Sequence, residues 1–526
     1  MNKINKYIAI LALLTGLVFT SCSDFLDVAP TDFISPENYF NTEQEAVLAV
    51  TGVYENLNSL YGGYFKSGFS ANTDEVVFSR MGGEPMKEHT FNANTGTVSS
   101  MWSNLYKGIY YANFFLENVD KINMKDSTKN SLRGEARFLR GYYYYHLAML
   151  WGDVPLRMKA TDSPLNTSMA SSPREVIFDT ICADMEYATK NLNIYSKQVG
   201  APVRISQEGA IGVLARVYLS MAGILNKPEY YAKARDLLIP LVESKAIKLN
   251  PDYTQIWKNI SADAYDHDSK EIMWDVDFNA DPTMFIYNGW AALTSHAAPA
   301  SDDVAAGYNL DWFRITITLW QYYQSDRNDV RYTWNICDYK INSTGVKVPK
   351  EAYTASGSNA SSRNPGKFRR DWETVLPRDK NRNGSNFPII RYSDVLLMLS
   401  EAENEVNGAT DLAFAGVDSV RSRAKAFKYS SLPVKPTTEE LRVIIQEERA
   451  RELCFESTTR YYDLLRWGII QERFIEVGNT FAQLAGSTGL NYANRLYYSF
   501  KPHMVLFPIP SSEIQLNPLV KQNPSW

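Results

Sequence analysis

Apolar residues recur every three or four positions along most of this chain, which is the spacing of one face of an α-helix. The first clear example lies at 43–61, where Ala46, Val50 and Val53 share such a face. The same spacing predicts further helices in the first half of the chain, at 99–119, 132–151, 172–192, 207–222 and 230–243. It returns in the second half, at 315–324, 392–406, 412–427, 438–455 and 460–470. Helices paired through short turns predict a mostly α fold of tetratricopeptide-like units with an irregular period.

The middle of the chain has a different pattern. Residues 271–278 alternate between apolar and polar types, which predicts a strand. The stretches 279–315 and 340–388 are rich in Gly, Ser, Asn and Pro, and loops of that length are usually functional or disordered. We therefore expect a helical scaffold at about 39–250 and 391–475, an irregular inserted region with a few short strands at about 255–390, and an irregular C-terminal tail at 476–526.

The N-terminus has the pattern of a secretory signal. Lys3 and Lys6 precede an apolar run at 8–19, which is too short to span a bilayer, and small residues lead to Cys22. We expect a lipoprotein signal peptide at 1–21, with Cys22 as the acylated mature N-terminus that anchors the chain to a membrane. Residues 22–38 then form a tether, and 39–526 form a single domain. The alternative is an ordinary secreted protein with a chance cysteine.

Composition narrows the possible partners. The net charge is −5 and the pI is about 5.8, which gives no electrostatic footprint for nucleic acid. The remaining cysteines, Cys182, Cys337 and Cys454, are odd in number and not spaced for a metal site or a disulfide framework. Cys182 and Cys454 lie inside helical patterns and are interpreted as small buried hydrophobes. The 33 tyrosines fit either a wet recognition surface or a tyrosine-rich helical core.

The sequence contains no recognisable catalytic constellation. Its five histidines are scattered, and it lacks the motifs HExxH, GxSxG, a phosphate loop and paired CxxC. The triplet Asp266-His267-Asp268 is interpreted as a polar loop rather than a metal site. Asp379, Asn381 and Asn383 match the first half of a calcium loop, but its twelfth position is Ile390 instead of glutamate, so a turn before a strand is the alternative. We expect no enzyme activity, no cofactor and no metal.

Several ordered blocks carry a family resemblance. They are CSDFLD at 22–27, GEARFLR at 134–140 with four tyrosines and GDVP after it, RYSDV at 391–395, EERARE at 447–452, RYYDLLRW at 460–467, PIP at 508–510 and QNPSW at 522–526. Together these blocks closely resemble the SusD/RagB family of outer-membrane nutrient-binding lipoproteins. By themselves, the charges of these blocks predict a structural role, in which charge-assisted hydrogen bonds tie helix faces together.

The resemblance implies a function in nutrient uptake. Such a protein lies on the outside of the outer membrane, binds a nutrient that is most often a glycan, and delivers it to a SusC-like TonB-dependent transporter that it covers as a lid. Acidic residues just after Cys22 resemble the signal for this location. Peptide capture by the same fold and a purely structural tetratricopeptide adaptor are the alternatives.

The resemblance places ligand contacts in two stretches of the chain. One contains Phe78 and Arg80, and the other is the variable, ligand-facing region at about 255–390. Trp290, Trp312 and Tyr287 are the main candidates there, with Phe285 and Tyr308 as further aromatics. Sugar rings stack on Trp and Tyr, and hydroxyls bond to polar side chains. Core packing is the alternative for each aromatic.

Overall fold

The structure is a computed structural model, and it describes residues 40–64, 73–79, 82, 85–161, 167–197, 200–278, 312–376, 378, 383–456 and 458–526. Some of the sequence-based predictions concern residues outside this part of the chain. They are those for the 1–38 leader with Cys22, and those for Arg80, Phe285, Tyr287, Trp290, Tyr308, Asp379 and Asn381.

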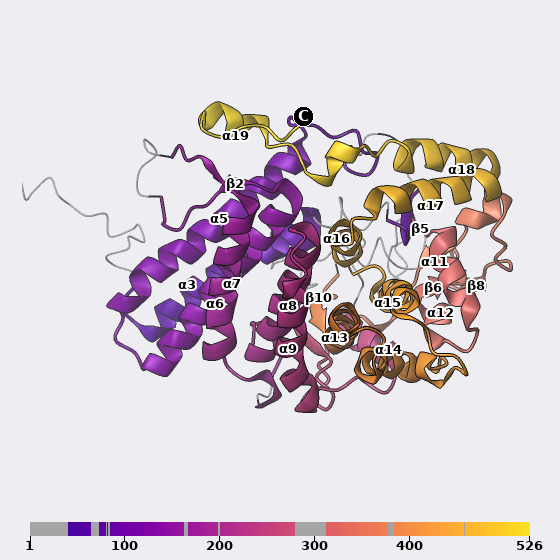
Figure 1. The fold of residues 1–526 in the computed structure, drawn as a ribbon, viewed down its shortest axis with the longest axis horizontal. Coiled ribbons are helices and arrows are strands. Elements are labelled where there is room, and N and C mark those ends of the chain that lie inside the picture. Colours follow the sequence, from indigo (N-terminus) through magenta and orange to yellow (C-terminus); the bar gives the residue numbers. More distant parts are fainter. Residues whose placement is uncertain are drawn as a thin grey trace, which may run out of the picture.

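The first half of the chain forms a layered set of helices, as the apolar spacing predicts. They are α3 (Glu43–Ser59), α5 (Gly96–Asn118), α6 (Asp126–Trp151), α7 (Arg174–Asn191), α8 (Gln207–Ile224) and α9 (Glu229–Glu243). Neighbours in sequence are neighbours in space, with α6 packed between α5 and α7 (Figure 1). Thr42 starts α3 through a capping box, because its hydroxyl accepts from the Glu45 N–H and the Glu45 carboxylate accepts from the Thr42 N–H.

The second half adds helices that pack directly onto the first set. They are α13 (Tyr392–Asn407), α14 (Asp411–Arg423), α15 (Thr438–Leu453), α16 (Thr459–Arg466), α17 (Ile470–Leu484) and α18 (Gly486–Tyr492). α13 contacts α9 and α16 contacts α8, so segments about 160 and about 250 residues apart in sequence lie side by side (Figure 1). The prediction of a mostly α fold is confirmed.

Three of the secondary-structure predictions are wrong. The expected irregular tail at 476–526 is helical over much of its length, through the end of α17, α18, a π-helical turn at Ala493–Tyr497 and α19 (Ser511–Leu516). The inserted region contains two helices that were not expected, α10 (Tyr253–Ala262) and α12 (Val330–Asn335). Its expected helix at 315–324 begins later, as α11 (Ile317–Tyr322).

The described strands are short and form antiparallel pairs. The pairs are β1 (Val76–Phe78) with β5 (Phe313–Ile315), β4 (Ile272–Val276) with β10 (Phe387–Arg391), β2 (Val154–Pro155) with β3 (Ser171–Ser172), β6 (Ile336–Cys337) with β9 (Asn364–Pro365), and β7 (Tyr339–Ile341) with β8 (Lys347–Pro349). The strand predicted at 271–278 is confirmed as β4. Its pairing with β10 closes the inserted region onto the start of α13.

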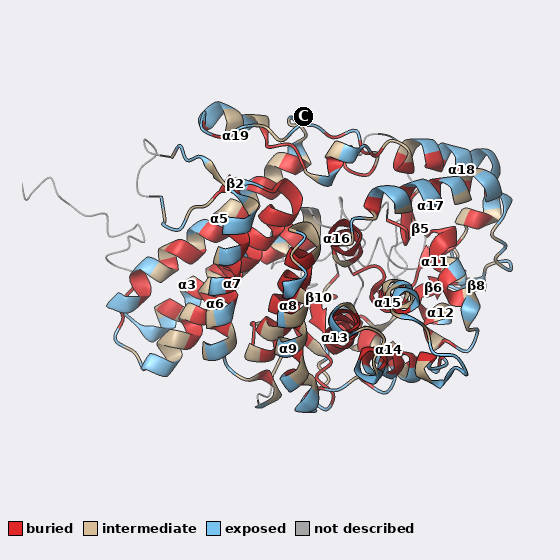
Figure 2. Cartoon of the chain, in the orientation of Figure 1, coloured by how far each residue is buried: buried red, intermediate tan, exposed pale blue. Residues whose placement is uncertain are grey.

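Helix α6 is the centre of the apolar core. Its residues are almost continuously buried from Gly134 to Trp151, and Figure 2 shows this buried stretch among its neighbours, whereas α19 has no buried residue. Four consecutive tyrosines at 142–145 lie inside, so for these four the core interpretation is correct. Each hydroxyl finds a neutral partner, since Tyr143 donates to the Val53 carbonyl and Tyr145 meets the Ser220 hydroxyl. Among the described residues, no helix is both long and apolar enough to cross a membrane.

Buried ion pairs join the helices of the second half. On α15, the Glu452 carboxylate accepts from Arg391, Arg423 and Arg331, and the side chains of all three are buried. The same pattern extends to Arg449, which bonds to Asp394 and Asp463. In the first half, Arg140 forms a bidentate pair with Asp184. The structural role predicted for these family blocks is confirmed.

Candidate functional site

The two stretches predicted to carry ligand contacts meet in one antiparallel ribbon. β1 pairs with β5 in a register that sets Val76 opposite Ile315, Val77 opposite Arg314 and Phe78 opposite Phe313. The ribbon continues one step further, because the Ser79 N–H and hydroxyl both donate to the Trp312 carbonyl, at 2.7 and 2.9 Å. Residues more than 230 positions apart in sequence are therefore fixed next to each other.

Trp312 and Phe78 differ in how far they are exposed to solvent. Phe78 is fully buried, and the Lys87 ammonium lies 3.8 Å from the centre of its ring. Trp312 is only partly buried and packs edge-to-face against Phe78, with ring centres 6.0 Å apart. The structure therefore brings these two predicted residues together, with Phe78 as the support and Trp312 as the ring nearer to solvent.

Buried charges fasten the ribbon to the helical scaffold. Asp74, just before β1, forms a bidentate pair with Arg460 of α16, at 2.8 and 2.5 Å. The next residue, Glu75, is also buried, and its carboxylate accepts from the Phe455 N–H at 3.1 Å. Burial raises the pKa of Glu75 to about 8, because the opposing effect of Arg460 is smaller than the desolvation of its carboxylate. The Thr316 N–H donates to the Glu75 carbonyl, so β5 is fastened at the same point.

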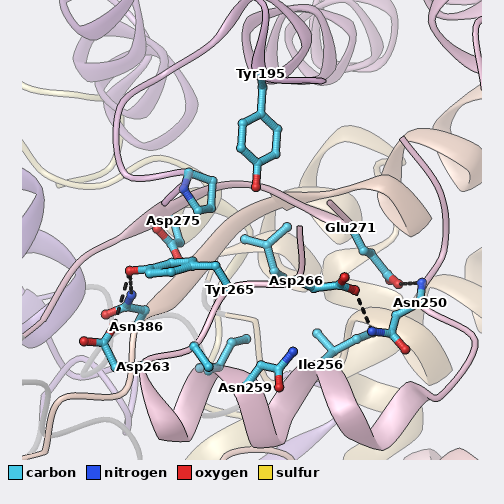
Figure 3. A pocket seen from close by; sticks show the side chains of 14 residues that line it. Tyr195, Asn250, Ile256, Asn259, Asp263, Tyr265, Asp266, Glu271, Asp275 and Asn386 are labelled. Carbon is cyan, nitrogen blue, oxygen red and sulfur yellow. Dashed lines mark hydrogen bonds between the residues drawn. The ribbon is translucent and has the colours of Figure 1, made fainter. Parts of the chain in front are cut away.

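A second feature of the inserted region is a pocket beneath β4. Aromatic and oxygen-bearing side chains line it, from α10, from the 263–275 segment and from Asn386 before β10 (Figure 3). The cavity among them has a volume of about 30 Å³. In Figure 3 the Tyr195 hydroxyl points into the pocket from one side, and Ile256 and Asn259 of α10 lie opposite. Asn386 donates to the Tyr265 hydroxyl at 3.1 Å and so holds that ring in place.

Asp275 is the unusual group of this pocket. It is 3 % exposed, and its Oδ1 atom has no hydrogen-bond partner among the described residues. Burial raises the pKa of Asp275 to about 8, and the neighbouring Asp277 and Asp263 add to the shift. At neutral pH the carboxyl is therefore largely protonated, and it can donate a hydrogen bond as well as accept one.

The remaining candidate positions have structural partners. Asp266 of the Asp-His-Asp triplet accepts from Ser269 and from Asn250, as the loop interpretation expects. Asn383, the last residue of the half calcium loop, is buried, and its side-chain oxygen accepts from the Ser385 N–H. Within the described residues, no group of three or more His, Cys, Asp or Glu side chains is arranged to hold a metal ion. Cys182 and Cys454 are buried, as predicted.

Sequence reasoning missed the pocket beneath β4 and its residues. Tyr195, Tyr265, Asp275 and Asn386 come from separate parts of the chain, and none lies in a recognisable motif. The only available signal was Asp275, a charged residue in the middle of the predicted strand. Its side chain faces inward, which alternation alone does not reveal.

The arrangement defines a class of protein, a tetratricopeptide-like helical scaffold that holds an aromatic ribbon and a polar pocket in an inserted region. Two family models match the chain, one described as the SusD family at 288–526 and one described as starch-binding and associating with the outer membrane at 24–219. The chain belongs to the SusD family.

Individual relatives agree with this assignment. SusD-like protein P25 of Formosa agariphila is 25% identical, and the alignment covers 96% of each chain. The starch-binding protein SusD of Bacteroides thetaiotaomicron is 26% identical over 47% of this chain and 46% of its own. A solved SusD homologue from Bacteroides thetaiotaomicron superposes with a TM-score of 0.83 at 24% identity, covering 93% of this chain and 98% of that one. A laminarin-binding SusD-like protein has a TM-score of 0.69 at 22% identity, covering 93% and 100%.

Proposed function

We propose that this protein is a surface-exposed outer-membrane lipoprotein that binds a glycan and delivers it to a SusC-like TonB-dependent transporter. The observation that carries the proposal is the β1–β5 ribbon, which sets the partly buried Trp312 on a support of buried aromatic rings. A tryptophan held in this way offers a rigid flat face to the C–H face of a sugar ring. Starch and laminarin binding by two relatives support the choice of a glycan.

The ribbon suits a binding role because its support is rigid. Phe78 contacts both Trp312 and Phe313, with ring centres 6.0 and 5.6 Å apart. The backbone of Trp312 is held by Ser79, and β5 is held through Glu75. A ring that is already ordered loses little conformational entropy when ligand binds. Trp290, Tyr287 and Arg80 are proposed as further contacts from the same two stretches of sequence.

Trp312→Ala tests the site. We expect a loss of glycan affinity of roughly 5- to 150-fold, the range for a central stacking residue, with a small change in melting temperature. Trp312→Phe keeps a stacking face and should retain most of the affinity. Trp526→Ala, which removes another partly buried tryptophan, is the matched control and should bind as the parent does. A glycan and peptide array identifies the ligand, and a Trp312-dependent signal confined to peptides would replace the glycan proposal.

The delivery role has its own test. Purification of the tagged protein from outer membranes under mild detergent should recover a large barrel transporter, through an interface of more than about 1,000 Å². Recovery of this chain alone from several mild detergents would contradict the partnership.

Acylation of Cys22 is tested by fractionation. Cys22→Ala should release the protein in soluble form or leave it in the inner membrane, because it removes the atom that carries the acyl chains. Unchanged recovery in the outer membrane would contradict the lipid anchor. In all of these assays we expect no turnover of the bound glycan, and sustained hydrolysis by pure protein would contradict a binding role.

A further inference from the structure

A separate groove lies on the outer face of α5, outside the inserted region. It has a volume of about 300 Å³, at the lower end of the ~300–1,000 Å³ typical of ligand sites. Its lining comes from α5, from the segment after β2 and from Glu513 of α19. The groove shares no lining residue with the β1–β5 ribbon or with the pocket beneath β4.

Three aromatic rings form the floor of this groove. Trp102, Tyr106 and Tyr110 are spaced by four residues and so lie along one face of α5. They become more accessible along the helix, from the buried Trp102 through the partly buried Tyr106 to Tyr110, which is 37% exposed. Tyr106 is oriented by its bond to the Pro155 carbonyl at 2.8 Å. The exposed face of Tyr110 is therefore the end of an ordered aromatic row.

The wall of the groove carries positive charge. Lys107, Arg157 and Lys159 line it, against the single carboxylate of Glu513, in a chain whose net charge is −5. Within the described part of the chain, none of these three cations forms an ion pair with a carboxylate. Glu513 is already engaged, because it accepts from Trp102 Nε1 at 3.3 Å and from Asn517 at 3.0 Å. The lining of the groove therefore carries more positive than negative charge.

A buried amide holds the backbone of two of the residues that carry these cations. Asn113 of α5 is 1% exposed, and its Nδ2 donates to the carbonyls of both Arg157 and Lys159, at 2.9 and 3.2 Å. Its Oδ1 accepts from the buried Arg140, which is itself held by Asp184. The segment that carries the cations is therefore fastened to the scaffold through a continuous buried chain of hydrogen bonds. The groove is built into the fold.

We propose that this groove binds an anionic saccharide, with a sugar ring on Tyr110 and its carboxylate or sulfate ester on Lys107, Arg157 and Lys159. Aromatic faces alone suit any sugar, but cations beside them that have no carboxylate partner among the described residues favour a sugar that carries negative charge. An anionic peptide is less well matched, because the groove floor is a row of flat rings without a strand edge for backbone pairing. The inference rests on the glycan-binding function proposed above for its ligand class, but it concerns a different site.

Calorimetric titration of the purified mature chain with tetragalacturonate tests the proposal. The carboxyl-reduced, neutral tetramer serves as the matched ligand, and a sulfated galactan tetramer separates carboxylate from sulfate recognition. We expect at least one acidic tetramer to bind and the neutral one to bind about tenfold more weakly or not at all. Raising the salt concentration about tenfold should weaken the acidic complex, since the exposed cations are screened.

Matched variants locate the binding to the groove. Lys107→Ala combined with Arg157→Ala should lower affinity for the acidic tetramer by about tenfold or more. Tyr110→Ala should lower it by about fivefold, whereas Tyr110→Phe keeps the ring face and should retain it. Lys125→Ala, which removes an exposed lysine at the start of α6, is the control and should change nothing. Circular dichroism checks that each variant is folded.

Three results would overturn the inference: no binding of either acidic tetramer, equal binding of acidic and neutral tetramers, or parent-like affinity in the double lysine–arginine variant. Trp312→Ala shows whether the groove inference or the proposed ribbon site has failed. If Trp312→Ala abolishes acidic binding and the groove variants do not, the groove inference fails and the ribbon site stands. If the groove variants lose acidic binding while Trp312→Ala affects no glycan, the groove stands and the ribbon proposal fails.

Discussion

The two halves of the helical scaffold are filled with different chemistry. Around α6 the core is apolar and aromatic, and its buried hydroxyls bond to neutral partners such as the Val53 carbonyl and the Ser220 hydroxyl. Around α13, α15 and α16 the interior holds fully buried arginines, including Arg331, Arg391 and Arg449, each bonded to carboxylates. A neutral core loses only the contacts that a substitution deletes. In an ionic core, the substitution also leaves a buried charge unpaired, and this lowers stability further.

The largest effect should follow from breaking the ionic core at its centre. Arg391→Met removes the guanidinium that bonds to Glu271, Glu452 and Glu456, and it leaves their charges buried. We expect the free energy of unfolding to fall by about 3–5 kcal/mol. Urea denaturation followed by circular dichroism measures this. A loss of less than about 1 kcal/mol would show that the network adds little.

Acid should weaken the ionic half before the aromatic half. Burial alone would raise the pKa values of Glu448 and Asp394, but neighbouring arginines lower each to about 2. Their contribution to stability is therefore present above the unfolded pKa of about 4 and is lost as the pH falls from there towards 2. Hydrogen exchange at pH 5 and pH 2.5 should show protection lost first in α13 and α15. An equal loss of protection in α6 would contradict the difference between the ionic and the aromatic half.

Glu75 should make the free energy of unfolding depend on pH in the opposite direction. It is a buried carboxyl group whose loss of hydration is not offset by its neighbours. Its pKa is raised to about 8, so between pH 5 and pH 8 the folded chain keeps a proton that the unfolded chain has released. Stability should fall by about 1.4 kcal/mol per pH unit in that window from this group alone. Glu75→Gln should flatten the slope of the unfolding free energy between pH 5 and pH 8. An unchanged slope would contradict the assignment.

A single substitution in the aromatic half should have a moderate effect. Tyr143→Phe keeps the buried ring and removes the hydroxyl that donates to the Val53 carbonyl at 2.6 Å. The expected loss is about 1 kcal/mol, because the change deletes one neutral hydrogen bond and leaves no charge unpaired. Comparison of its denaturation midpoint with that of Arg391→Met directly tests the difference between the two cores. Equal losses of stability in the two variants would contradict the proposed difference between the cores.

The smallest effect should come from an ion pair outside both cores. Lys435 and Asp411 lie 2.7 Å apart, but their side chains are 50% and 91% exposed. Lys435→Ala should leave the urea midpoint of unfolding almost unchanged, because water and salt already screen the pair. A loss comparable with that of Arg391→Met would mean that burial is not what separates the strong pairs from the weak ones.

Local apolar spacing was enough to predict the helical scaffold. Residues that share a helix face are three or four positions apart, so the spacing that predicts α3 or α6 is present within a single stretch of chain. Capping is equally local, as Thr42 and Glu45 show. The structural role of the charged blocks was also predictable, because arginines and glutamates in an apolar helix pattern need buried partners.

The partners and the sites were decided only by the tertiary structure. Nothing near Glu452 in sequence marks Arg331, which lies 121 residues away, and nothing near Ser79 marks Trp312. The same holds for Asp275, whose burial depends on how β4 packs, and for Asn113, which holds the backbone of Arg157 and Lys159 on another segment. Local spacing fixes which elements form, since their hydrogen bonds close within a few residues. Pairing between distant segments depends on how whole helices pack, and one stretch of sequence carries no record of that.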